Sequence, residues 1–480
     1  MRAVTRARVG GALAAALALA VAALLLYAYR DLLARSFAAD DFQWLLNVRG
    51  LGVRAVVRTA FDAGAQTHFY RPLVWLLFWL QVRAFGLDPR GFHALSLGLH
   101  LLNAGLLGWL AYRLRLGGRR SAAAGLAAAA IVLLHPAPFE AVSWISAQSE
   151  LLAALLLLLA LHCWLPGAGG RTLAQVLLAT LALGLALLAK ESAVIGLVLL
   201  ALLGEATAAP RARVGWLGRL APYLLPTLLT LAYLALQLVV ERRNYLLAQG
   251  GYGLGTQLLL NPLRSLALIV APLPGTEHAD NAWLVPVGAL VLLVLLGLLA
   301  WQRRAAPPRV YLVPAIIAAL GLTLLPTAPF SSPPDSRYLY LPVLIAALLV
   351  AALGAQLMRL GARLSRSPAL PAGAALLLML ALAWWAAGQL HAREGQFAAG
   401  AGPGGSLWRL AGEVCAQGAP ERMVIVEPPL AAPHAVAIIE LACGRSTQVL
   451  VVGRDQAAAA GVHALVIGFP NGSATVERTT

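Results

Sequence analysis

The sequence has few charged residues for its length. Charged side chains make up 12% of its 480 residues, whereas 60% are hydrophobic, and the mean hydropathy is +0.78. Soluble domains carry about 25% charged residues. The composition therefore excludes an ordinary soluble domain. The many separate apolar runs predict a polytopic membrane protein, because each run can satisfy its own backbone hydrogen bonds in a bilayer only as a helix.

Lysine and cysteine are also scarce. Lys190 is the only lysine, which indicates arginine-for-lysine bias in a GC-rich genome and favours a bacterial source. The three cysteines, Cys163, Cys415 and Cys443, have no metal-binding spacing. Cys163 is expected to be a small core residue of a helix. Cys415 and Cys443 can form a disulfide if their region lies in an oxidising compartment, and both the paired and the free states stay open.

Long repeats and polyanion-binding basic clusters are missing as well. No repeat of 20 to 50 residues occurs, which excludes solenoid arrays. The formal net charge of +16 comes from arginines in short loops between apolar runs. There they orient helices by the positive-inside rule rather than recruit nucleic acid. The sequence therefore predicts the lipid bilayer, and no nucleic acid, as a partner.

The apolar runs predict about eleven transmembrane helices. The first, at 9–27, follows basic residues but lacks a clear cleavage site, so we expect an uncleaved anchor that leaves the next loop outside. The others are expected near 91–112, 121–135, 148–165, 172–189, 193–204, 220–240, 283–301, 310–328, 338–358 and 370–388.

Two shorter apolar segments decide the span count. We interpret 72–86 and 257–272 as interfacial or re-entrant helices on the outer side, because counting them as spans would move arginine-rich loops outside. The rival count of both as full spans gives thirteen helices. Either count leaves the C-terminal region outside.

The chain divides into three parts by composition. Residues 1–388 are expected to form the transmembrane domain, with an outer loop at 29–71. Residues 389–405 are expected to form a Gly-rich linker. Residues 406–480 contain short β-branched runs separated by turn residues, which predict a small α/β or β-rich domain on the outer, periplasmic side.

Polar residues at the expected helix ends fall on the outer side of this topology. They are Asp40, Asp41, His68, Arg71, His135, Glu140, Glu150, Lys190, Glu191, Asp335 and Arg337. An ionisable group at bilayer depth costs about 2.5 to 3.5 kcal/mol, so such groups usually mark function. Carboxylates mixed with cations on one side favour an anionic substrate and acid–base chemistry.

Ordinary structural roles compete with this interpretation. Asp40 and Asp41 suit the N-cap of the helix that follows them, although one can cap while the other acts as a base. Arg71 suits an interfacial side chain whose stem packs on apolar surface. Lys190 and Glu191 suit an ion pair at a helix junction.

Four runs in order, FYRPLVWLLFWLQVRAFGLDPRGFH, LLHPAPFEAVSWISAQSELL, LALLAKESAVIG and SRYLYLP, resemble the membrane domain of the C-type (GT-C) glycosyltransferase superfamily. The likeness is nearest to bacterial relatives of the transmembrane and tetratricopeptide-repeat O-mannosyltransferases. It is more distant to protein O-mannosyltransferases and lipid A aminoarabinose transferases. It covers about residues 36–345. Each run is weak alone, and their combination in this order is specific.

The resemblance implies roles for particular residues. It implies that Asp40 or Asp41, with Asp40 favoured, is the general base toward the acceptor. It also implies that Arg71, Lys190 and Arg337 hold the phosphate of a lipid-linked donor.

A second group of residues is assigned less narrowly. Glu150 matches a second acidic position of the family, with a role toward the acceptor or a divalent metal. Glu140 and His135, from the same outer side, are candidates for the same roles. The chain departs from the family at Ser336, where an acidic residue is common, and in having no tetratricopeptide repeats.

The sequence thus predicts a multi-pass glycosyltransferase of the bacterial inner membrane that uses a polyprenyl-phosphate-linked monosaccharide as donor. The acceptor stays open between a protein, a glycolipid and an envelope polymer. A lipid-linked sugar transporter or flippase is the alternative, although it calls for polar groups at the bilayer midplane. A non-catalytic assembly scaffold is a further alternative.

Overall fold

The computed structural model describes ten segments of the chain. They are residues 16–64, 69–118, 121–166, 170–207, 216–242, 250–273, 281–304, 311–364, 369–457 and 464–477.

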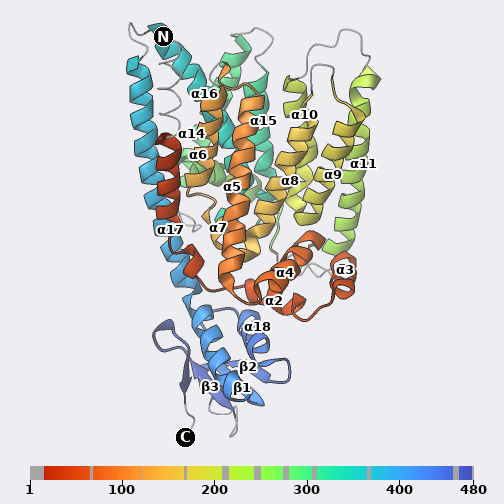
Figure 1. The fold of residues 1–480 in the computed structure, drawn as a ribbon, viewed down its shortest axis with the longest axis vertical. Coiled ribbons are helices and arrows are strands. Elements are labelled where there is room, and N and C mark those ends of the chain that lie inside the picture. The colour runs from red at the N-terminus through yellow and green to blue at the C-terminus, as the bar shows by residue number, and fades with distance from the viewer. Residues whose placement is uncertain are drawn as a thin grey trace.

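An elongated helical bundle is joined at one end to a small sheet domain (Figure 1). Six described helices are long and apolar enough to cross a membrane: Ala16–Ala34, Pro89–Arg113, Ile145–Trp164, Leu217–Val240, Leu284–Gln302 and Ser336–Gly361. These helices make the protein a multi-pass membrane protein. The expected spans 121–135, 172–189 and 310–328 correspond to shorter apolar helices, and the total number of spans stays a prediction.

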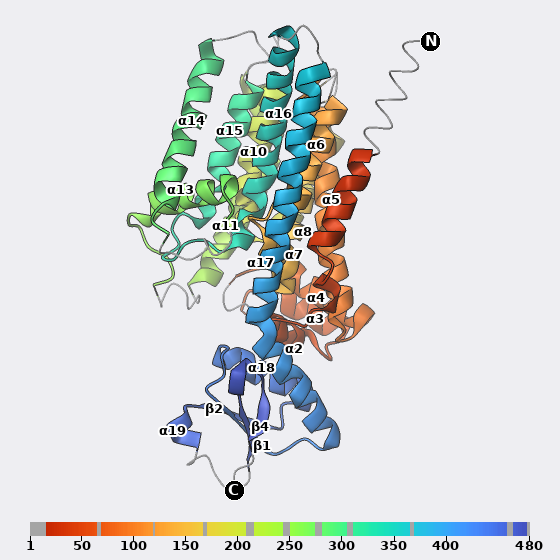
Figure 2. The same cartoon turned by 90° about the vertical axis from the view of Figure 1, so that its left-hand side faces the viewer.

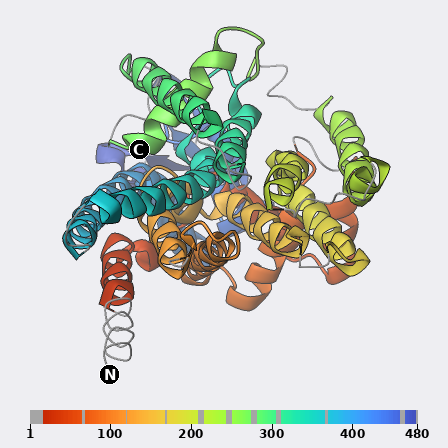
Figure 3. The same ribbon diagram turned by 90° about the horizontal axis from the view of Figure 1, so that it is seen from above.

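The helices that run along the bundle have the following bounds: α5 (Pro89–Arg113), α6 (Ser121–Leu134), α8 (Gln148–Trp164), α9 (Leu173–Ala189), α10 (Gly196–Thr207), α11 (Trp216–Glu241), α14 (Leu284–Arg304), α15 (Leu312–Thr323), α16 (Tyr340–Leu364) and α17 (Ala369–Gln417). The span that contains α8 has 72% of its residues buried, against 17% for the span of α14. Helix α8 therefore lies in the core, and α14 lies at the periphery. The N-terminal helix is also peripheral in the view along the bundle (Figure 3).

Short helices gather at the end of the bundle that faces the sheet domain (Figure 1). They are η1 (Leu32–Ala34), α2 (Asp41–Val48), α3 (Val53–Phe61), α4 (Pro72–Phe85), α7 (Phe139–Ser143), η3 (Ile145–Ala147), η4 (Glu191–Ile195), η5 (Leu325–Thr327) and η6 (Ser336–Leu339). Helix α4 has only 14 residues and packs against α2 and α3. It matches the segment expected as interfacial. The other such segment, α13 (Gln257–Val270), runs across the bundle axis (Figure 2).

Basic residues mark the opposite helix ends. Helix α8 runs away from the short helices and ends where the carbonyl of Trp164 accepts a hydrogen bond from Arg171 Nε at 2.9 Å. Helix α5 ends beside it, with Arg113 donating to the carbonyl of His162. Arg359 lies near the corresponding end of α16. Arg113, Arg171 and Arg359 therefore lie at the helix ends away from the short helices, where the sequence analysis expects the cytoplasmic side.

The C-terminal region is an α/β domain. Its four strands are β1 (Arg422–Val426), β2 (Gln448–Val452), β3 (Leu465–Gly468) and β4 (Thr475–Glu477), in the order β2-β1-β3-β4. Strand β1 is parallel to β2 and β3, and β4 is antiparallel to β3. The other elements are α18 (Ala432–Cys443), α19 (Arg454–Ala457) and η7 (Pro470–Gly472). The sequence left an α/β and a β-rich domain open, and the described residues form the α/β one.

The segment expected as a Gly-rich linker is helical instead. Residues 389–405 lie inside α17, which continues unbroken for 49 residues from the bundle into the α/β domain (Figure 2). Glycine costs about 1 kcal/mol relative to alanine within a helix. Tertiary packing outweighs this propensity here, because Gly404 and Gly405 face other elements closely. An added Cβ at Gly405 would lie 3.1 Å from Ser36 Cβ.

One hydrophobic core joins the bundle end to the α/β domain. It contains Phe42 and Leu45 of α2, Leu407 of α17, and Ile438 of α18. A disulfide between Cys415 and Cys443 links α17 to α18, so the paired state left open by the sequence is the one observed. The two parts are therefore packed together rather than tethered.

Candidate active site

Asp41 supports the turn that leads into α2. Its side chain is buried and only 1% exposed. Oδ2 accepts from the Ala38 amide at 2.9 Å, and Oδ1 accepts from both the amide, at 2.7 Å, and the hydroxyl of Ser146. Burial raises the pKa of Asp41 to about 7, although the hydrogen bonds from Ser146 and Ala38 oppose this rise. Because its two oxygens accept three hydrogen bonds from both segments, Asp41 ties the turn to the segment around Ser146.

Asp40 is the accessible member of the acidic pair. Its side chain is 48% exposed and makes no capping hydrogen bond to α2. Its Oδ1 lies 2.8 Å from Nε2 of His434 in α18. The expected N-cap role therefore does not occupy this carboxylate. Its contact with the α/β domain is a feature that the sequence did not indicate.

The residue before Asp40 has an unusual backbone conformation. Ala39 has φ +46, in the left-handed region that costs a residue with a Cβ roughly 1 to 2 kcal/mol. Such strain persists only where the surroundings fix it, and it clusters at functional sites. Here both backbone groups of the preceding residue are held, since the Ala38 amide donates to the Asp41 carboxylate and the Ala38 carbonyl accepts from the Trp144 indole.

Arg71 begins the cationic part of the site. It lies at the N-cap of α4 and holds Glu191 through two bonds, Nε to Oε2 at 2.8 Å and Nη2 to Oε1 at 2.7 Å. Burial alone would raise the pKa of Glu191, but the charges of Arg71 and then Lys190 lower it to about 2. Arg71 also lies 4.2 Å from the ring centre of Phe69.

Lys190 and Arg337 meet at the ring of Tyr338. Lys190 Nζ lies 4.9 Å from the ring centre, and the Arg337 guanidinium lies 4.8 Å from it. Lys190 is buried and pairs with Glu150 at 2.5 Å, not with its neighbour Glu191. The ion pair between Lys190 and Glu191, which the sequence left as an alternative structural role, is therefore not the one observed: Glu191 pairs with Arg71 instead.

Arg337 has two acidic partners. Its Nη2 lies 2.6 Å from Asp335 Oδ2, and its Nη1 lies 3.6 Å from Glu140 Oε2. The structure therefore brings the expected cations together in a cluster, each held in place by a carboxylate.

Trp144 connects this cluster to the acidic turn. The Arg337 guanidinium lies 4.6 Å from the Trp144 ring centre. The Trp144 indole Nε1 donates to the carbonyl of Ala38 at 3.2 Å. The same short segment supplies Ser146 to Asp41. The segment between α7 and α8 therefore lies between the acidic turn and the cations and contacts both.

The three candidates for an acceptor or metal role are already engaged. Glu150 pairs with Lys190, and Glu140 contacts Arg337. His135 bridges backbone groups, with Nε2 2.9 Å from the Ile269 carbonyl and Nδ1 3.2 Å from the Ala137 amide. Among the described residues, no three His, Cys, Asp or Glu side chains are grouped so that they could hold a metal ion.

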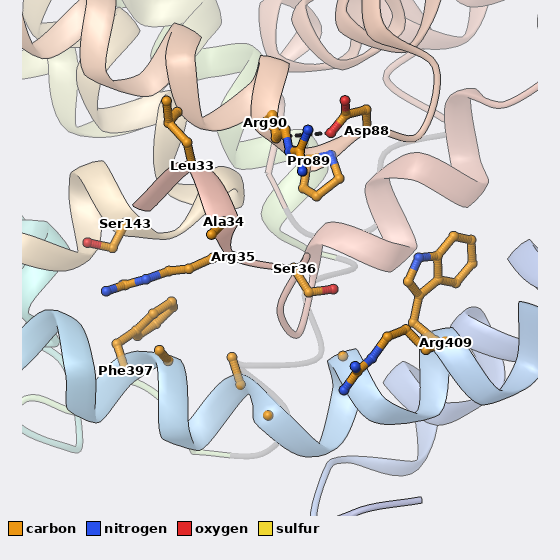
Figure 4. Close-up of a pocket in the computed structure, with 15 residues that line it drawn as sticks. Leu33, Ala34, Arg35, Ser36, Asp88, Pro89, Arg90, Ser143, Phe397 and Arg409 are labelled. Atoms are coloured by element: carbon orange, nitrogen blue, oxygen red, sulfur yellow. Dashed lines mark hydrogen bonds between the residues drawn. The ribbon is translucent and has the colours of Figure 1, made fainter. Parts of the chain in front are cut away.

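A cavity of about 580 Å³ lies beside the acidic turn, between η1, the start of α5 and α17 (Figure 4). Its lining includes Arg35, Ser36, Arg90, Phe397, Trp408 and Arg409. The side chain of Arg35 extends between Ser143 and Phe397, and Ser36 points toward Arg409 (Figure 4). The cavity therefore combines apolar surface with cationic groups.

A buried carboxylate lies behind this cavity. Glu394 of α17 is 0% exposed; it forms an ion pair with Arg35 and accepts a hydrogen bond from the Ser143 hydroxyl. No sequence pattern pointed to Arg35 or Glu394 as site residues. Glu394 lies in the segment interpreted as a linker, where a carboxylate is ordinary. Had this segment been predicted as a helix packed against the bundle, a carboxylate in it would have been a candidate functional residue.

No family model matches the chain, and no curated protein matches it by sequence. Among solved structures, it is similar to ArnT from Cupriavidus metallidurans bound to undecaprenyl phosphate. The identity is 14%, 95% of this chain and 93% of that chain are covered, and the TM-score is 0.46.

The chain is also similar to the oligosaccharyltransferase AglB from Archaeoglobus fulgidus in complex with an inhibitory peptide and a dolichol-phosphate. The identity is 14%, 90% of this chain and 64% of that chain are covered, and the TM-score is 0.46. The apo form of an Archaeoglobus fulgidus oligosaccharyltransferase gives 13% identity, 92% and 65% coverage, and a TM-score of 0.49. The chain therefore spans less than two thirds of the oligosaccharyltransferase chains.

Proposed function

We propose that this protein is a membrane glycosyltransferase of the C type, with a polyprenyl-phosphate-linked monosaccharide as donor. The observation that carries the proposal is that one accessible carboxylate, Asp40, lies at the same end of the bundle as a cluster of three cations, Arg71, Lys190 and Arg337. The Trp144–Ser146 segment joins the two groups. This is the equipment that a single displacement requires: a base for the acceptor and stabilisation for an anionic leaving group.

The reaction follows from these positions. Asp40 takes the proton of an acceptor hydroxyl as that oxygen attacks the anomeric carbon of the donor. The bond from the anomeric carbon to the phosphate oxygen breaks, and the lipid phosphate leaves with the electron pair. A single displacement inverts the configuration at the anomeric carbon. Asp41 does not take part in proton transfer, since its oxygens already accept three hydrogen bonds.

The cations act on the leaving phosphate through their remaining donors. Arg71 uses two of its five N–H groups on Glu191. The cluster as a whole contains three cations and four carboxylates, which are Glu140, Glu150, Glu191 and Asp335. The cluster therefore has no net positive charge. It binds a phosphate through the N–H groups of Arg71, Lys190 and Arg337 that their carboxylate partners leave free. The carboxylates fix the cations in place before the donor arrives.

The acceptor enters through the cavity beside the acidic turn. Phe397 and Trp408 offer apolar contact, and Arg90 and Arg409 offer cationic contact. Such a lining fits an amphiphilic acceptor with an anionic group, of which a glycolipid is one case. A protein or an envelope polymer stays open as the acceptor.

The proposed site lies on the outer face of a bacterial inner membrane. The arginine-rich helix ends at the far side of the bundle support this orientation, as does the disulfide, because disulfides persist in oxidising compartments. A transporter or flippase is disfavoured because the charged residues of the site gather at one end of the bundle rather than at its middle.

The test is transfer by the purified protein from polyprenyl-phosphate sugars to candidate acceptors. Asp40→Asn removes the base and is expected to lower the transfer rate by about 100-fold or more. Arg71→Ala is expected to lower it by a similar factor because it removes leaving-group stabilisation. The matched control is Asp31→Asn, an exposed aspartate near the acidic turn whose ion pair with Arg30 lies at the surface.

Two outcomes would contradict the proposal. Wild-type transfer by both Asp40→Asn and Arg71→Ala would remove the site assignment. Movement of the lipid-linked sugar across proteoliposome membranes without transfer would favour the transporter.

A further inference from the structure

The proposed base touches a histidine from a distant part of the chain. Asp40 Oδ1 lies 2.8 Å from His434 Nε2, and the two residues are 394 positions apart in sequence. His434 lies near the start of α18, and its side chain is 21% exposed. The contact engages only Oδ1 of Asp40. The other oxygen, Oδ2, makes no capping hydrogen bond to α2.

Several independent contacts fix His434 against Asp40. Helix α18 packs against both α2 and α17. Phe42 of α2 and Ile438 of α18 belong to the same buried cluster. Arg49, which follows α2, donates to the carbonyl of Leu441 at the other end of α18. The Cys415–Cys443 disulfide holds α18 to α17.

Because α18 is fixed against α2 and α17, the contact between His434 and Asp40 can do more than pack the two parts together. A carboxylate that acts as a base works best when one oxygen is fixed and the other faces the acceptor. A side chain that hydrogen-bonds to a reacting group can fix that group's orientation. An imidazole with its proton on Nε2 donates to Oδ1 and leaves Oδ2 for the acceptor hydroxyl. The imidazole keeps its own proton throughout.

We propose that His434 of the α/β domain is a positioning residue for Asp40, so that the C-terminal domain completes the catalytic site. This inference rests on the proposed function, because it assigns a partner to the same base. It also gives the α/β domain a role in transfer that does not depend on recognising the acceptor.

The test compares His434→Ala with His434→Gln in steady-state transfer assays. His434→Ala is expected to lower kcat by about 10- to 100-fold with little change in the KM for the lipid-linked donor. His434→Gln is expected to recover part of this loss, because its amide N–H can donate to Asp40 Oδ1. The matched control is His391→Ala, which removes a histidine of α17 that contacts Arg30 rather than Asp40.

A coupled variant separates positioning from folding. The double variant Asp40→Asn/His434→Ala is expected to be no slower than Asp40→Asn alone, because the histidine acts through the carboxylate. Each variant is checked for a wild-type melting temperature and for an intact disulfide. If His434→Ala does not fold, His434→Phe decides the question through its own kcat, because phenylalanine fills the ring's space and has no N–H to donate.

The outcomes separate a failure of the inference about His434 from a failure of the proposed function. Unchanged transfer by Asp40→Asn would overturn the proposed function. Loss of transfer by Asp40→Asn together with wild-type kcat in folded His434→Ala, or in folded His434→Phe where His434→Ala does not fold, would overturn only the role of His434. An equal fold-loss from His434→Ala in the presence and absence of the Asp40 carboxylate would also overturn it.

Discussion

At the scale of single residues, the two neighbouring aspartates have opposite environments. Asp41 is buried under three hydrogen bonds, and Asp40 is half exposed beside His434. The sequence predicted that one member could be structural while the other works. It could not say which partner either one would have, because Ser146 and His434 are about 100 and 400 positions away.

The carboxylate of Asp41 gives a pH-dependent prediction for stability. Asp41→Asn places an amide N–H₂ opposite the N–H of Ala38 or Ser146, so a buried donor loses its acceptor at a cost of about 1 to 3 kcal/mol. Burial raises the pKa of Asp41 from its ordinary value of 3.8 to about 7. The folded protein thus holds a proton that the unfolded chain releases, and the wild type loses stability as the pH rises through that window.

Asparagine does not titrate, so the stability gap between wild type and Asp41→Asn is expected to shrink between about pH 4 and pH 7. Thermal unfolding in detergent, followed by tryptophan fluorescence, measures this gap. Asp31→Asn, at an exposed position, serves as the control for general pH effects. A gap that widens with rising pH would contradict the assignment.

At the scale of elements, α17 differs most from its sequence interpretation. The run AAGAGPGG predicts a linker by composition, yet it lies inside α17, and four of its residues line the cavity. Ala398, Ala401, Gly402 and Gly405 follow the i, i+3, i+4, i+7 spacing of a single helix face. Small residues here let α17 approach Ser36 and leave space for the cavity. Composition alone could not separate this helix face from a flexible linker.

Filling this face tests the acceptor route. Ala401→Trp places an indole in the cavity and is expected to raise the KM for the acceptor several-fold while the KM for the donor stays the same. Ala399→Trp carries the same side chain on an exposed position of α17 and is the matched control. Steady-state transfer at varied acceptor and fixed donor concentration measures the difference. An equal change in both variants would exclude the cavity as the route.

Other elements could be predicted because their signals are local. The apolar runs, the basic loops and the β-branched strands are encoded by neighbouring residues, and they gave the bundle, its arginine-rich end and the C-terminal α/β domain. The site residues on helix ends were predicted as a set for the same reason. Their pairings, such as Lys190 with Glu150 and Arg71 with Glu191, depend on tertiary packing and were not predictable.

At the scale of the whole molecule, the bundle end and the α/β domain act as one packed unit. Phe42 of the outer loop and Ile438 of α18 share a core, and the disulfide closes a loop between positions 28 residues apart. In the chain-entropy model, a loop of this size stabilises the folded state by about 3 to 4 kcal/mol. Because α18 carries His434, loosening this connection is expected to affect the site as well as the fold.

The double variant Cys415→Ser/Cys443→Ser tests this coupling. It is expected to lower the melting temperature and to reduce kcat, because α18 no longer holds His434 firmly against Asp40. Cys163→Ser is the matched control, since Cys163 is a free cysteine of the bundle, and it should leave both quantities unchanged. A lower melting temperature with wild-type kcat would mean that the disulfide stabilises a domain on which transfer does not depend. A reduction of both the melting temperature and kcat would instead support the α/β domain as part of the catalytic unit. Asp40 and all three cations belong to the bundle, so a bundle that worked alone would keep its kcat without the disulfide.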